Sequence, residues 1–588
     1  MNLSFVEYRT CVLPHEDDQC FPISKLEDVW TWSDENACKW DTKPLQPSTN
    51  YCYKGSGSSC HLDWKDWKLS PRIGRETVPK TLVCHDMKGG YLGDRFINGT
   101  QVYDEYRFFH WAGIDIFVYF SHHLVTIPPP MWINAAHLHG VKILGTFITE
   151  WKSGEKICQE ILKNPESIKK FIMKLVGIAD HYGFDGWLVN IENKVCDEVG
   201  QVKDLVSLVD QLRNEMHNSN PDSLVIWYDS VTGIDGKLDW QNELNSCNRI
   251  FFDHCDGIFL NYAWEEKNIE KSKTNALDRL HDVYVGIDVF GRKFYEGGGF
   301  NTYKALEVAR KYNLSVAIFA PGWVHEIHGP ENFSNLEYFF WKTLQPYLYL
   351  HGPTKLPFQT SFCHGAGLMK YHLGQVVSNS PWFNLSLQQY QPSTGSCRYI
   401  SFEDNKIKTG QEVPGCIENY VDDAFNGGGS LILQMPRSGS NIPPGSDISS
   451  PQRILLCSLF CSEQFILSIA TKKLDEDAEL GILVKVKTVK GKHHSFLLQE
   501  KNETVLKFPE DLQVILPVDD TQEKRLKEQF DMLGAIPSGL SIDRSGNWEM
   551  RYYLIPQHQV TILEIGALIH VGSVLLGFLD IRELKPRE

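Results

Sequence analysis

The chain has 588 residues, of which 42% are apolar and 22% charged, so the composition excludes global disorder and supplies material for several packed cores. Its formal net charge of −16 at pH 7 disfavours nucleic acid and anionic membrane surfaces as partners.

The first 20 residues lack a basic start followed by an apolar run, so they do not resemble a secretory signal, and we expect the protein in the cytosol. Its 15 cysteines include no CxxC pair, which favours free thiols over a zinc site. The apolar stretch 560–581 is interrupted by Glu564 and His570, and it is more typical of buried strands than of a membrane span. We expect a monomer without a membrane span.

Residues 1–79 show little periodicity and are predicted to form an irregular lead-in that packs on the next domain. From residue 80 to residue 346, eight short apolar, β-branched runs alternate with helix-like stretches. The runs lie at 81–86, 114–120, 141–148, 186–192, 223–229, 257–263, 283–290 and 315–323. Such alternation predicts a parallel sheet, and eight repeats predict a (β/α)8 TIM barrel over 80–346. The alternative, an open doubly wound sheet, would need a Gly-rich phosphate turn after an early strand, which is absent.

After residue 346 the sequence pattern changes to short strand-like runs separated by Gly, Pro and Asn turns, which is typical of β-sandwiches. We predict one sandwich over 347–475, a candidate carbohydrate-binding module, and a second over 476–588. The predicted fold class is therefore α/β, a TIM barrel followed by one or two all-β sandwich domains.

The fourth run, FDGWLVNIEN, carries the most informative polar residues. Successive strand residues point to opposite sides, so Leu188, Asn190 and Glu192 share one face, with the two polar residues last. Catalytic residues of a TIM barrel lie at the carboxyl ends of its strands. A lone Glu after a strand is more often a solvated loop residue or a helix cap, but an Asn inside an apolar run weakens that interpretation because an unpaired buried amide is costly.

This run resembles the chitinase-type pattern D-x-x-D-x-D-x-E, with Asp185 and Glu192 in its outer places and Leu188 and Asn190 in its middle ones. With Asn190 there, DGWLVNIEN resembles glycoside hydrolase family 85, the endo-β-N-acetylglucosaminidases. The phrases HDMKGGYLGDRF, GTFITEW, IWYDSVT, FLNYAW, GIDVFGR and FAPGW are similar to the same family. The resemblance covers the barrel strongly and the following region loosely.

The resemblance implies cleavage between the two N-acetylglucosamines of an N-glycan core, in N-glycans, free oligosaccharides or glycoproteins. A retaining glycosidase ordinarily needs two carboxyl groups, and the fourth strand ends with one. Substrate assistance resolves this, because a 2-acetamido group can supply its own carbonyl oxygen as nucleophile. Glu192 would then be the proton donor and acceptor, with its pKa raised by a pocket without another negative charge nearby, and Asn190 would hold the acetamido group.

Further site residues are expected at other strand ends. Tyr228 is predicted as a third catalytic contact, directed at the same acetamido group. Asn261, Trp111, Trp264 and Trp323 are predicted to bind substrate, although core packing is an equally good interpretation for each Trp. Asp229 and Asp288 are predicted to bind sugar hydroxyls or to pair with Arg292.

Two rival functions remain open at this point: a non-catalytic glycan-binding barrel, and a chitinase-like hydrolase of a linear polymer. The retained Glu192 disfavours the first and Asn190 disfavours the second. No metal or cofactor is implied.

Overall fold

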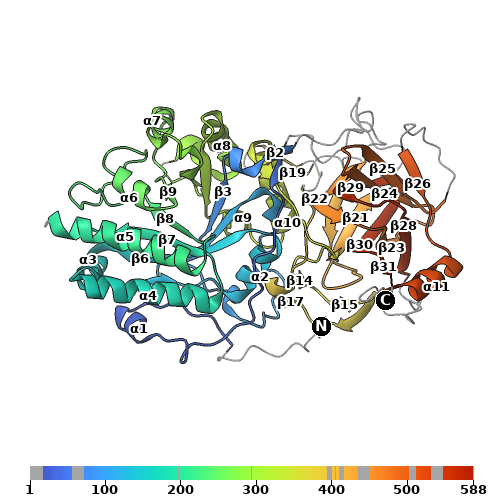
Figure 1. Ribbon diagram of the computed structural model, residues 1–588, viewed down its shortest axis with the longest axis horizontal. Coiled ribbons are helices and arrows are strands. Elements are labelled where there is room, and N and C mark those ends of the chain that lie inside the picture. Colours follow the sequence, from blue (N-terminus) through green and yellow to red (C-terminus); the bar gives the residue numbers. More distant parts are fainter. Residues whose placement is uncertain are drawn as a thin grey trace.

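The computed structural model describes residues 18–55, 72–195, 199–292, 294–393, 400–403, 406–409, 416–434, 451–501, 512–531 and 547–586 (Figure 1). A barrel with surrounding helices occupies one half of the molecule, and stacked β-sheets occupy the other half (Figure 1). The first 17 residues and residues 56–71 of the predicted lead-in lie outside the described parts.

Eight parallel strands form the barrel, and each one overlaps a run that the sequence predicts, with β6 extending two residues beyond its run. They are β3 (Thr81–His85), β4 (Ile116–Tyr119), β6 (Lys142–Glu150), β7 (Gly186–Glu192), β8 (Leu224–Tyr228), β9 (Gly257–Phe259), β10 (Val283–Asp288) and β11 (Ser315–Phe319). The strands pair in the order β4-β3-β11-β10-β9-β8-β7-β6, and a β4–β6 pairing closes the ring. A short strand, β5 (Val125–Thr126), adds to β6 in the antiparallel direction. The predicted TIM barrel is confirmed.

Helices follow most of the barrel strands and cover the outside of the ring (Figure 1). They are α2 (Pro130–Leu138), α3 (Trp151–Ile161), α4 (Pro165–Tyr182), α5 (Val199–Ser219), α6 (Arg249–His254), α7 (Glu266–Ala276), α8 (Thr302–Lys311), α9 (Trp323–His328) and α10 (Phe333–Leu344). The boundaries of α4 follow from local chemistry, because the Asn164 side chain accepts a hydrogen bond from Ser167 N and Gly183 ends the helix with a φ of 74°.

The lead-in contacts the barrel directly where it is described. Its helix α1 (Leu26–Thr31) lies against α4, and the Trp30 ring meets the edge of Phe171 at 5.8 Å between centroids. Strand β1 (Tyr51–Lys54) pairs with β2 (Arg72–Gly74) and with β12 (Tyr349–Leu350), which follows the barrel.

Two further sheets face each other across one apolar core. One consists of β20 (Cys416–Tyr420), β21 (Ser430–Gln434), β30 (Ser573–Glu583), β23 (Phe465–Lys473) and β28 (Glu549–Ile555), with β13 (Phe358–Thr360) paired to β30. The other consists of β22 (Gln452–Cys461), β29 (Val560–Val571), β24 (Glu479–Thr488), β25 (His493–Leu498) and β26 (Leu512–Ile515).

These pairings correct the predicted division at residue 475. Strand β22 pairs with β29, and β23 pairs with β30, so each sheet contains strands from both sides of that position. The described strands therefore form one sandwich instead of two. Alternating polarity identifies strands but carries no information about distant pairing partners, which explains the error.

The apolar stretch 560–581 forms β29 and most of β30, as the sequence predicts. Among the helices of the described ranges, none is long and apolar enough to cross a membrane.

Smaller elements connect the barrel and the sandwich or lie at the far end of the sandwich. They are β14 (Ala366–Gly367), β15 (Lys370–His372), β16 (Gln375–Ser378), β17 (Trp382–Phe383), β18 (Ile400–Glu403), β19 (Lys406–Thr409), β27 (Phe530–Asp531), β31 (Lys585–Pro586) and α11 (Asp520–Gln529).

Candidate active site

Strand β7 carries its polar residues toward the mouth of the barrel. Leu188 packs with apolar residues of the other barrel strands in the barrel interior, and it is 2% exposed. Because side chains alternate along a strand, Asn190 and Glu192 continue on the same face toward the carboxyl end. Both polar residues are therefore at the end of the barrel where catalytic groups of this fold lie.

Glu192 has the environment of a proton-transfer group. Its side chain is half-buried, and desolvation raises the pKa of its carboxyl group above the ordinary value. The indole N–H of Trp240 donates a hydrogen bond to Glu192 Oε1 over 3.1 Å, and this bond acts in the opposite direction on the pKa. A carboxyl group with a raised pKa retains its proton at a pH where an ordinary Glu has lost it, so it can protonate a leaving group.

Asn190 presents an unsatisfied acceptor beside this carboxyl group. The residue is 4% exposed, and its Oδ1 atom has no hydrogen-bond partner in the described protein. An unpaired buried amide oxygen costs about 1–3 kcal/mol of stability. This oxygen can accept a hydrogen bond from an N–H donor that enters the mouth of the barrel.

Tyr228 ends the neighbouring strand β8 and is fixed by a chain of amide groups. Its hydroxyl donates to Asn261 Oδ1 over 2.8 Å, and Asn261 Nδ2 donates to Asn242 Oδ1 over 2.7 Å. Asn261 therefore orients the Tyr228 hydroxyl. The substrate-binding role predicted for Asn261 stays a prediction.

Asp229 organises the loop that carries Trp240. Its carboxylate accepts hydrogen bonds from the backbone N–H groups of Gln241 and Asn242 and from Asn248 Nδ2. Burial raises the pKa of Asp229 to about 6 even though these hydrogen bonds act to lower it. Asp229 is thus part of the loop structure, whereas Asp288 forms the predicted ion pair with Arg292 over 3.0 Å.

A second carboxyl group lies beside Glu192, contrary to the prediction of a pocket without another negative charge. Glu150 ends β6 and is the Cα partner of Glu192 in the β6–β7 ladder. His122 Nδ1 lies 3.1 Å from Glu150 Oε2, and this hydrogen bond raises the pKa of the imidazole. The sequence interpretation missed Glu150 because it ended the third run at residue 148. Continuing the alternation by two residues would have placed a carboxylate at the mouth.

The three predicted sugar-binding tryptophans have different positions. Trp111 precedes β4, so it lies toward the opposite end of the barrel, and it is fully buried with its indole N–H donating to Gln388 Oε1 over 2.6 Å. Its predicted substrate-binding role is wrong because a core side chain offers no free face. Trp264 is 3% exposed and donates to the Gly286 carbonyl oxygen, so it anchors a loop. Trp323 follows β11 and stays partly exposed at the mouth.

Trp111→Phe tests this correction. The change removes the donor to Gln388 and leaves a buried amide oxygen unpaired, which should lower the free energy of unfolding by about 1–3 kcal/mol. The KM for the glycan substrate that the sequence predicts should stay that of the wild type. Chemical denaturation and steady-state kinetics check the two parts, and a raised KM without loss of stability would restore the sugar-binding role.

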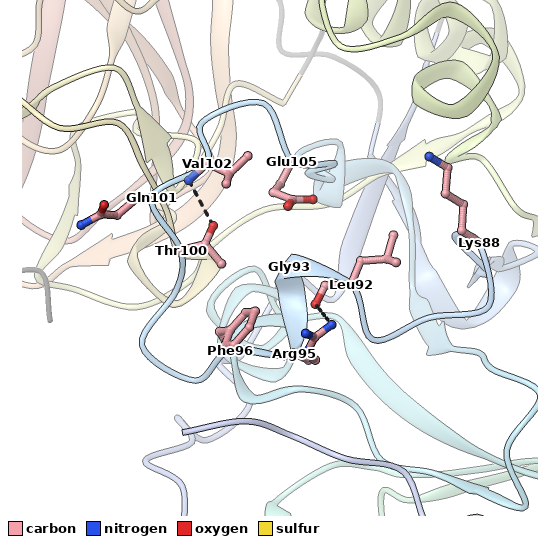
Figure 2. Close-up of a pocket in the computed structure, with 9 residues that line it drawn as sticks. All are labelled: Lys88, Leu92, Gly93, Arg95, Phe96, Thr100, Gln101, Val102 and Glu105. Carbon is pink, nitrogen blue, oxygen red and sulfur yellow. Dashed lines mark hydrogen bonds between the residues drawn. The ribbon is translucent and has the colours of Figure 1, made fainter. Parts of the chain in front are cut away.

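A hollow of about 570 Å³ lies along the loop that leaves β3 (Figure 2). Leu92, Phe96 and Val102 give it an apolar lining, and the Glu105 carboxyl group extends over Gly93. None of the predicted site residues lines this hollow.

A closed TIM barrel with a Glu of raised pKa at the end of its fourth strand suits the glycoside hydrolase class. Residues 91–370 match the profile of the family described as Glycosyl hydrolase family 85. The matched part of the chain, residues 91–370, belongs to that family, as the resemblance of its motifs indicates.

The chain is similar to several proteins named cytosolic endo-beta-N-acetylglucosaminidase. It is 47% identical over 370 residues to the one from Gallus gallus, covering 63% of this chain and 48% of the relative. It is 44% identical over 460 residues to the one from Danio rerio, covering 77% and 60%. The chain thus spans about half to three fifths of the length of these relatives.

A solved structure supports the fold over nearly the whole chain. The glycoside hydrolase domain of Endo-D from Streptococcus pneumoniae R6 superposes with a TM-score of 0.68 at 18% sequence identity, covering 96% of this chain and 83% of that chain. At this level of identity, the match bears on the fold alone.

Proposed function

We propose that this protein is a retaining endo-β-N-acetylglucosaminidase that cleaves the GlcNAc-β1,4-GlcNAc bond of the N-glycan core. With an N-glycan, the products are a released glycan and one GlcNAc that stays on asparagine. With a free oligosaccharide that ends in chitobiose, the terminal GlcNAc is released as a free sugar. The observation that carries the proposal is the unpaired, buried Asn190 Oδ1 beside a Glu192 with a raised pKa. The names of the relatives support the same substrate class and a cytosolic location.

The residues supply a mechanism with one proton-transfer group. Asn190 Oδ1 accepts the acetamido N–H of the substrate, which turns the acetamido carbonyl oxygen toward the anomeric carbon. That oxygen attacks the anomeric carbon as Glu192 gives its proton to the leaving glycosidic oxygen, and an oxazolinium ion forms that keeps the amide proton in the hydrogen bond to Asn190. The hydroxyl of Tyr228 turns its proton from Asn261 to the acetamido carbonyl oxygen and holds the same group.

Glu192 then acts as a base. It removes a proton from water as the water oxygen bonds to the anomeric carbon and the oxazoline ring opens, which restores the acetamido group and retains the anomeric configuration. A sugar hydroxyl in place of water completes a transfer to an acceptor by the same step. Unlike a purely glycan-binding barrel, this scheme gives the raised pKa of Glu192 a role.

A mass measurement tests the proposal. Incubation with an Asn-linked high-mannose glycopeptide should release the glycan and leave the peptide with one N-acetylhexosamine. A linear chitin oligosaccharide, offered in parallel, should stay intact. An unchanged glycopeptide, or cleavage of the chitin oligosaccharide alone, would contradict the proposed function.

A further inference from the structure

The pairing of β6 with β7 brings two glutamates to the same edge of the barrel mouth. Glu150 and Glu192 are Cα partners, and paired positions of neighbouring strands lie roughly 5 Å apart and point to the same face. The Glu150 side chain is only 18% exposed, so water screens its charge incompletely. A carboxylate here disfavours a second negative charge on Glu192.

The negative charge of Glu150 is matched by one imidazole. Nδ1 of His122, which lies shortly after β4, is 3.2 Å from Glu150 Oε1 and 3.1 Å from Oε2. The hydrogen bond to Glu150, together with the charges of Glu150, Asp86 and Glu192, raises the pKa of His122. His122 therefore still carries its proton where a carboxyl group titrates, because an ordinary imidazole titrates about two pH units above an ordinary Glu.

The remaining groups that face Glu192 carry no such charge. Tyr228 of β8 and Tyr262 of the loop after β9 have pKa values raised well above the ordinary value by burial, so both stay neutral. Trp240 contributes a neutral N–H. Asn190 also contributes a neutral hydrogen bond, whereas the charges of Glu150 and His122 act on Glu192 in opposite directions.

We propose that Glu150 and His122 form a positioning pair that sets the proton-donating state of Glu192. Glu150 keeps Glu192 protonated before cleavage, and His122 limits this effect so that Glu192 can release its proton to the leaving oxygen. The proposal rests on the proposed function. It assigns positioning roles to Glu150, the Cα partner of Glu192, and to His122, which contacts Glu150.

The two members should shift the pH profile in opposite directions. Activity needs protonated Glu192, so kcat/KM falls on the basic side as Glu192 loses its proton. Glu150→Gln removes the negative charge and should move this basic limb to lower pH by about one unit. At a pH above the limb, kcat/KM should therefore fall about tenfold relative to the wild type. His122→Asn removes the positive charge from Glu150 and should move the limb to higher pH. Glu150→Asp keeps the charge and should restore most of the wild-type position.

Glu105→Gln is the matched control, since Glu105 is also a partly buried carboxyl group with a pKa raised by burial but lies away from Glu192. Its profile should overlay that of the wild type. Thermal unfolding of each variant separates misfolding from a change in titration. Superimposed profiles for folded Glu150→Gln and wild type, or shifts of the same sign in Glu150→Gln and His122→Asn, would overturn the proposal.

A second measurement does not depend on turnover. The infrared carboxyl signal that disappears in Glu192→Gln reports the protonation of Glu192, and it can be titrated in the wild-type and Glu150→Gln backgrounds. If the titration of Glu192 moves to lower pH in Glu150→Gln, the result supports the pair, whether or not a glycan is cleaved. Absence of glycan cleavage would count against the proposed function alone. An unmoved titration overturns the pair whatever the activity.

Discussion

Glu192→Gln should lower turnover of an N-glycan substrate by about two to four orders of magnitude, the usual contribution of general acid–base catalysis. The amide keeps the shape of the side chain and its contact with Trp240 but cannot transfer a proton. Turnover is measured on a glycopeptide by product mass. Glu166→Gln, a matched change in the first turn of α4 on the barrel exterior, should retain wild-type turnover.

Near-normal turnover by a folded Glu192→Gln protein would show that another group transfers the proton. Glu150 would then be the first candidate, since it is the Cα partner of Glu192 on the neighbouring strand.

Asn190→Ala should abolish hydrolysis of the intact glycan but retain use of a preformed sugar oxazoline as donor to an N-acetylglucosamine acceptor. The reason is that Asn190 assists formation of the oxazoline, while Glu192 remains to deprotonate the acceptor hydroxyl. We expect loss of hydrolysis by at least about a hundredfold, since correct orientation of a neighbouring nucleophile contributes several kcal/mol. Product formation from the intact glycan and from the oxazoline, at equal protein concentration, measures the two activities separately.

Glu192→Gln serves as the comparison, because it should be weak with both donors. If folded Asn190→Ala binds substrate yet fails with the oxazoline as badly as with the glycan, Asn190 does not act by positioning the acetamido group. Thermal unfolding of Asn190→Ala checks the fold, because the residue is buried and its loss leaves a small cavity.

The predictions from sequence succeed where the signal is local. The eight runs of the barrel match β3, β4 and β6–β11, because a strand buried on both faces must be continuously apolar and the helices between strands have their own periodicity. The placement of Asn190 and Glu192 follows from strand alternation alone. A polar residue in an apolar run is costly, so its presence indicates a site.

Only the tertiary structure decided which distant residues meet. The charge pair of Glu150 and His122, the loop that brings Trp240 to Glu192, and the burial of Trp111 against Gln388 all join segments from different parts of the chain. The same holds for the sandwich, where β22 and β23 find partners about a hundred residues away. Alternation and composition fix which face of an element is buried, but the neighbour that covers that face depends on how the whole chain packs.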